Sequence, residues 1–141
     1  MDTADQFTFN KLACLYLGGE AFYSNPSKPV LFTTTDFLKV KRNHWEEAVY
    51  YLEFNRVPVL DEAARQQLLG SYLLLSLPWD SGSRYDFILK TDFYSHDQFF
   101  SSEERLKKLT HDLRPNGPDL LSGLKPDTFL ELISTVTRHY I

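Results

Sequence analysis

The chain has 141 residues, a net charge of −4 and 43% apolar residues, so we expect residues 1–141 to fold as a single globular domain. Its one cysteine, Cys14, excludes an internal disulfide and favours a reducing, cytoplasmic location. No signal peptide is visible, and the longest apolar run, residues 68–77, is too short for a membrane span. These observations predict a small acidic soluble protein with no membrane partner.

The first half of the chain predicts two helices and a short strand. Apolar residues recur at helical spacing from Asp5 to Leu17, where two glycines then stop the helix. Residues 30–34 have strand composition, and a helical segment is expected to begin at Asp36-Phe37-Leu38. The spacing of Trp45, Ala48, Val49 and Leu52 predicts a helix from His44 to about Asn55, either separate from the segment that opens at Asp36 or continuous with it as one helix. An alternative interpretation takes Tyr50 to Val59 as a strand.

Residues 61–77 are the stretch around which the fold is predicted to form. Asp61 is suited to cap a helix, Ala63 and Ala64 favour one, and the second half is apolar on almost every helical face. A helix with that pattern is buried, so we expect it at the centre of the molecule. The small residues Gly70 and Ser71 predict a point where another backbone approaches closely.

The remaining chain predicts one strand and two more helices. Residues 84–94 alternate with a period of two, which indicates a strand. Ser101 and Glu104 have capping-box spacing and open a helix to about Leu113, and Pro126 opens a final helix to the C-terminus. The fold class is therefore expected to be mostly α or α+β. About five helices would surround the central helix 61–77, with a small antiparallel strand pair from residues 30–34 and 84–90.

Motifs for catalysis, metals or cofactors are not found. There is no nucleophile motif, and Cys14 is expected to be buried packing. The four histidines have no metal-ligand spacing, and the glycines are scattered, so neither a metal nor a cofactor is predicted. Lys39, Lys41, Arg42 and His44 form the only basic cluster. In an acidic domain we interpret it as a solvated face, so a nucleic acid partner is not predicted.

The segment from Trp79 to Phe100 is the candidate recognition surface, because it is both acidic and aromatic. Aromatic side chains supply rigid contact area, and carboxylates steer a positively charged partner. The candidate partner-binding residues are Trp79, Asp80, Asp86, Asp92, Tyr94 and Asp97. The alternative is a hairpin whose aromatics belong to the core and whose acids form an ordinary solvated face, which internal pairing with Arg84, Lys90 and Arg105 would indicate.

These observations predict that the protein acts by binding another protein, of basic character, as an inhibitor, an immunity-type neutraliser or an adaptor subunit. The absence of catalytic motifs is the main support. The competing hypothesis is a small enzyme or ligand-binding domain. Its pocket would lie between the central helix and the strand pair, lined by Tyr72, Trp79 and Tyr85.

Overall fold

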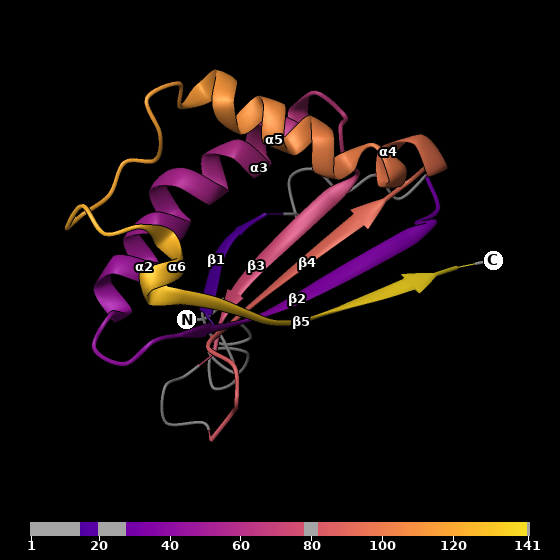
Figure 1. Cartoon of the computed structure of the whole chain (residues 1–141). Coiled ribbons are helices and arrows are strands. Elements are labelled where there is room, and N and C mark those ends of the chain that lie inside the picture. The colour runs from indigo at the N-terminus through magenta and orange to yellow at the C-terminus, as the bar shows by residue number, and fades with distance from the viewer. Residues whose placement is uncertain (1–14, 20–27, 78–81, 141) are drawn as a thin grey trace, which may run out of the picture.

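A computed structural model describes residues 15–19, 28–77 and 82–140. Within these residues, five strands form one antiparallel sheet in the order β1-β3-β4-β2-β5. The helices gather on one side of this sheet (Figure 1). The fold is therefore α+β, with a sheet at its centre.

The strands are β1 (Leu15–Gly19), β2 (Phe32–Val40), β3 (Ser71–Ser76), β4 (Phe87–Phe93) and β5 (Leu130–His139). The helices are α2 (Trp45–Tyr51), the π-helical turn η2 (Leu52–Arg56), α3 (Val57–Arg65), α4 (His96–Phe100), α5 (Ser102–Leu113) and α6 (Pro126–Phe129). None of the described helices is long and apolar enough to cross a membrane.

The core lies between the helices and one face of the sheet. In β4 the buried residues alternate with half-buried or exposed ones, and Phe87, Leu89 and Phe93 all face the helices. Their cross-strand neighbours in β3 include Leu74, which is fully buried. Ala63 on α3 is likewise fully buried. The period-two pattern of residues 84–94 is thus confirmed as a strand that buries one face.

The helical run from residue 45 to residue 65 is continuous but changes its winding at η2. Pro58 has no N–H, and its ring crowds the carbonyl of Phe54, so an ordinary α-helical turn is disfavoured there. The chain widens into a π-helical turn instead, with the N–H of Val57 bonded to the carbonyl of Leu52. The helix predicted from His44 to Asn55 is confirmed and extended, and the alternative strand over residues 50–59 is wrong.

The predicted central helix over residues 61–77 is contradicted. Helix α3 ends at Arg65, Gln67 adopts a positive φ of 62°, and the apolar run that follows is strand β3. A short run that is apolar on every side fits a buried strand as well as a buried helix, because periodicity does not separate the two. Since β3 pairs with both β1 and β4, the sheet and not a helix occupies the centre.

Gly70 confirms the predicted close approach of a second backbone. Its N–H donates to the carbonyl of Asp92 at 2.8 Å, and a Cβ at this position would lie 2.9 Å from that same oxygen. The chain therefore enters β3 in direct contact with β4.

Three further helix predictions are wrong or only partly testable. The segment opening at Asp36 belongs to β2, and the final helix stops at Phe129, after which β5 begins. β-Branched residues such as Val136 favour the extended backbone, and pairing with β2 supplies the hydrogen bonds that this backbone needs. Of the first predicted helix, residues 15–17 lie in β1, and the remainder, with Cys14, lies outside the described residues.

The helix over residues 101–113 is confirmed, and the two predicted strands belong to neighbouring antiparallel strands, but residues 32–34 pair with residues 91–93 and not with the predicted 84–90. Helix α5 covers Ser102–Leu113, and β2 pairs antiparallel with β4. The expected capping box is not formed, because the Ser101 hydroxyl contacts Asp97 instead of a helix N–H.

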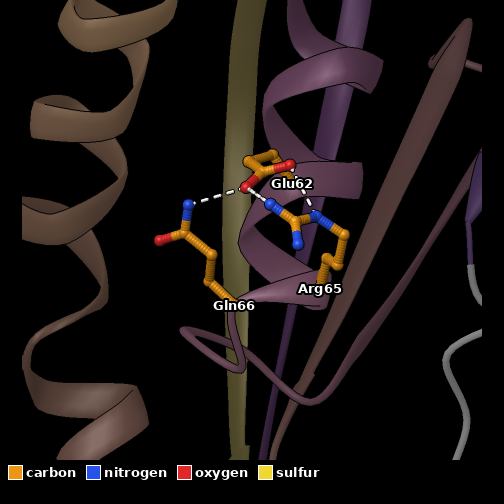
Figure 2. A network of polar contacts seen from close by, with 3 residues as sticks. All are labelled: Glu62, Arg65 and Gln66. Atoms are coloured by element: carbon orange, nitrogen blue, oxygen red, sulfur yellow. Dashed lines mark hydrogen bonds and ion pairs between the residues drawn. The ribbon is translucent and has the colours of Figure 1, made fainter.

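A polar network fixes the end of α3, as Figure 2 shows. The Glu62 carboxylate accepts hydrogen bonds from the guanidinium of Arg65 and from the side-chain amide of Gln66. The bonds from Arg65, and then from Gln66, hold the pKa of Glu62 below its ordinary value. The last turn of α3 is therefore stabilised by a charged carboxylate.

Candidate functional site

Strand β5 lies at one edge of the sheet and pairs only with β2 among the described residues (Figure 1). Most of its ten residues are exposed. The unpaired N–H and C=O groups of such an edge form a template for another strand. This backbone row is therefore a candidate binding surface.

The register shows which backbone groups of β5 point outward. The N–H of Tyr140 donates to the carbonyl of Leu31 at 2.8 Å, so residue 140 faces β2. Backbone groups alternate in direction along an antiparallel strand. Counting back, Thr135, Thr137 and His139 direct their N–H and C=O groups away from β2. We call these three residues the β5 edge.

The side chains of β5 include exposed apolar groups. Leu132 is 56% exposed and Val136 is 55% exposed. A β-bulge between Leu132 and Ser134 lets the pairing with β2 skip Ile133. From Ser134 to Thr137 the strand has neither charge nor proline, which are the usual protections of an exposed edge.

Aromatic rings gather at the C-terminal end of β5. The Phe32 ring stacks on Phe99 with centroids 4.1 Å apart and on His139 with centroids 4.3 Å apart. Phe100 and His96 complete this group, which we call the aromatic cluster (Phe32, His96, Phe99, Phe100 and His139). Phe32 is buried, whereas Phe100 is 72% exposed. The Phe100 side chain is thus exposed to solvent while it contacts the buried ring of Phe32.

The predicted recognition residues are spread over several elements. Trp79 and Asp80 lie outside the described residues. Asp86 directly precedes β4 and Asp92 lies near its end, six residues on, which corresponds to roughly 20 Å along a strand. Tyr94 is half-buried with its ring against Gly70, and Asp97 lies in α4.

Each described carboxylate among these candidate residues forms a hydrogen bond or an ion pair with another residue of the chain. Asp86 accepts the N–H of Val40 at 2.7 Å and lies 3.9 Å from the ammonium of Lys39. Asp92 pairs with Lys90 at 3.3 Å and accepts a hydrogen bond from Thr33 at 2.8 Å. Asp97 pairs with Arg105 at 3.0 Å.

These pairs remove the argument that linked the acids to a basic partner. Two of them use Lys90 and Arg105, the bases whose pairing indicates an ordinary solvated face. The described acids therefore make contacts within the chain, and their role in binding a partner stays a prediction from the sequence. Of the predicted segment from Trp79 to Phe100, the last two residues, Phe99 and Phe100, belong to the aromatic cluster together with His96.

The pocket expected beside the central helix is not formed by the described residues. Tyr72 is 1% exposed in the core and donates its hydroxyl to Asp61 at 2.5 Å. Tyr85 lies on the opposite face of the sheet, where its ring contacts Phe37. The third expected residue, Trp79, is outside the described residues.

The arrangement of His44, Glu47 and Ser122 resembles a catalytic triad only in composition. Glu47 lies in the middle, accepting from Ser122 on one oxygen and contacting His44 on the other at 2.5 Å. A nucleophilic serine needs the histidine beside it to accept its proton. The hydrogen bonds from His44 and Ser122 instead hold the pKa of Glu47 below its ordinary value and tie α2 to a loop.

The described residues contain no group of three or more His, Cys, Asp or Glu side chains that could hold a metal ion. The basic cluster is also divided, because Lys39 contacts Asp86 and Lys41 donates to the carbonyl of Asp127 at 2.9 Å.

Comparisons with protein-family models, with curated proteins and with solved structures found no match to this chain.

The β5 edge was missed because its apolar residues also fit a helical stripe. A signal for it was present in the run Ile133-Ser134-Thr135-Val136-Thr137, in which four of five residues are β-branched.

Proposed function

We propose that the protein acts by binding another protein, and that an extended segment of the partner adds to β5 as a further strand of the sheet. The observation that supports this is the β5 edge, a row of outward backbone groups with no partner among the described residues. In this mode of recognition, main-chain hydrogen bonds supply affinity and alternate side chains supply specificity.

The side chains beside the edge fit the same proposal. Val136 and Arg138 lie on one face of β5, and Thr137 and His139 lie on the other. A partner strand would therefore meet one apolar group on the first face and an aromatic ring on the second. Exposed Phe100 extends that second contact, since aromatic residues are enriched in the centres of interfaces.

A basic partner, and a role as inhibitor, immunity-type neutraliser or adaptor, stay predictions from the sequence. Asp97 is the most exposed of the described candidate acids, with 71% of its side chain accessible. Its ion pair with Arg105 would compete with any basic group of a binding protein. Backbone addition to β5 does not depend on that charge.

The experiment that tests the proposal is affinity capture from native cells with Thr137→Pro, compared with Thr137→Ala. The proline removes an outward N–H and leaves the ladder to β2 intact, because residues 138 and 140 make the bonds on that side. We expect wild type and Thr137→Ala to capture the same protein and Thr137→Pro to lose it. A photo-crosslinking amino acid at Val136 should link to that protein, and one at Lys108 on α5 should not.

Retention of the partner by Thr137→Pro, with no crosslink from position 136, would contradict the proposal. Circular dichroism and the melting temperature establish that the variant is folded. If Thr137→Pro unfolds, Val136→Lys places a charge on the edge and gives the same expectation.

A further inference from the structure

A cleft of about 710 Å³ lies between the helical run η2–α3 and α5, and the loop after α5 closes one end of it. Helices α3 and α5 run side by side on the helix-covered side of the sheet (Figure 1). The lining of the cleft includes the largely apolar side chains of Tyr51, Val59 and Leu106. Its volume falls within the roughly 300–1,000 Å³ of small-molecule sites.

The charge that lines this cleft is opposite to the charge of the whole chain. Arg56, Lys107 and Arg114 all reach it, and Glu103 is the one carboxylate among its described lining residues. The chain as a whole carries −4. Positive groups in a cleft with low-dielectric walls concentrate the field there, so anions are attracted to it.

Arg114 is held in place by neutral acceptors. Its Nη2 donates to the carbonyl of Phe54 at 2.6 Å, and its Nε donates to Asn55 Oδ1 at 3.3 Å. The Phe54 carbonyl is free to accept because Pro58, four residues on, has no N–H. The guanidinium is therefore positioned while its positive charge keeps no carboxylate partner among the described residues.

Asn55 makes the wall of the cleft rigid. The residue is 5% exposed, its Nδ2 donates to the carbonyl of Asp119 at 2.7 Å, and its Oδ1 accepts the N–H of Asp119 at 2.8 Å. These two bonds tie the loop after α5 to η2. The Asp119 carboxylate itself accepts the hydroxyl of Tyr50 at 2.9 Å.

Arg56 is half-buried and forms no ion pair within the described part of the chain. It also borders a second cavity of about 330 Å³, which Asp36 and Asp127 line, but neither carboxylate comes within ion-pair distance of it. The Arg56 guanidinium therefore keeps a positive charge at the wall of the cleft, where an anionic ligand would be attracted to it. The π-helical turn that carries Arg56 is also a feature frequent at functional sites.

We propose that this cleft binds a small molecule with a carboxylate or phosphate group on an aromatic or apolar body. The anion would lie among Arg56, Lys107 and Arg114, because a guanidinium donates two parallel hydrogen bonds to either group. The apolar body would cover Val59 and Leu106. This site is separate from the β5 edge, so either proposal can hold without the other.

The test uses three naphthyl probes that differ in charge, followed by their own fluorescence: 1-naphthyl phosphate, 1-naphthaleneacetate and the neutral 1-naphthalenemethanol. We expect at least one anion to bind with 1:1 saturation and about tenfold or more tighter than the neutral probe. The anion that binds more tightly identifies the preferred head group. Arg56→Gln and Lys107→Gln should each weaken the anions by about tenfold and leave the neutral probe unchanged.

The matched control is Lys108→Gln. Lys108 is the next residue on α5 and carries the same charge, but it points away from the cleft and pairs with Asp112 at 3.0 Å. Anion binding should not change in this variant. The proposal is overturned if no anion binds, if the neutral probe binds equally well, or if Lys108→Gln weakens binding as much as Lys107→Gln. Melting temperatures of the variants exclude loss of fold as the cause.

Discussion

At Gly70 the chain turns into β3 so close to β4 that a side chain has no room. A Cβ there would lie 2.9 Å from the carbonyl oxygen of Asp92 and 2.9 Å from the Tyr94 ring. Real Cβ atoms do not approach other atoms so closely, so either the backbone contact or the Tyr94 ring must shift. Position 70 therefore requires glycine, because it is the one residue without a Cβ atom.

We predict that Gly70→Ala destabilises the protein by about 1–3 kcal/mol, the usual cost of overpacking. Chemical denaturation measures the change in the free energy of unfolding. At a site with free space, a Gly→Ala substitution stabilises the folded protein by about 0.4–1 kcal/mol, because alanine lowers the conformational entropy of the unfolded chain. A more stable variant would therefore show that the close contact does not exist.

At the scale of one element, helix α3 depends on the charge of Glu62. Hydrogen bonds from Arg65 and Gln66 lower the pKa of this carboxyl below its ordinary value of 4.5. A lowered pKa in the folded state means that the ionised form stabilises the fold. This stability is fully present above pH 4.5 and is lost as the pH falls through the lowered pKa.

We predict that Glu62→Gln makes unfolding less sensitive to acid. The free energy of unfolding of wild type should fall more than that of the variant between neutral pH and the region below pH 4.5. Glu53→Gln is the control, because it removes the same charge from an exposed position of the same helical run. Equal acid sensitivity of wild type and Glu62→Gln would contradict the role of the network in Figure 2.

At the scale of the whole molecule, the sheet buries one face under helices, and neighbouring residues of β3 therefore have different environments. Leu74 is fully buried against the helices, whereas Leu75 faces the other side and is half-buried. In a buried helix the two positions would share one environment. Substitution of both therefore distinguishes the two folds.

We predict that Leu74→Ala costs about 2–5 kcal/mol, the range for a large core residue. Leu75→Ala should cost clearly less, because part of its surface is already exposed. Denaturation of the two single variants gives both values. Equal losses would support the helix that the sequence analysis expected over residues 61–77.

The strand at residues 84–94 and the helix at 101–113 were predicted because their patterns are unambiguous. Alternation in β4 and the spacing of Leu106 and Leu109 in α5 each fit one structure only. The candidate sites were not predicted. The β5 edge depends on which strand is last in the sheet, and the cleft joins Arg56 and Arg114, which are far apart in sequence.

The sequence by itself determined the balance of apolar and polar residues, the helical run around residues 45–55, and the need for a small residue at position 70. It did so because composition, local periodicity and side-chain size act over a few residues. Only the tertiary structure decided that residues 71–76 and 130–139 are strands. Both runs satisfy the local requirements of a helix, and cross-strand hydrogen bonds to β4, β1 and β2 determine the outcome. Long-range contacts also brought Asp86 beside Lys39 and placed three cations around one cleft, since the order of charges in the sequence does not specify their arrangement in space.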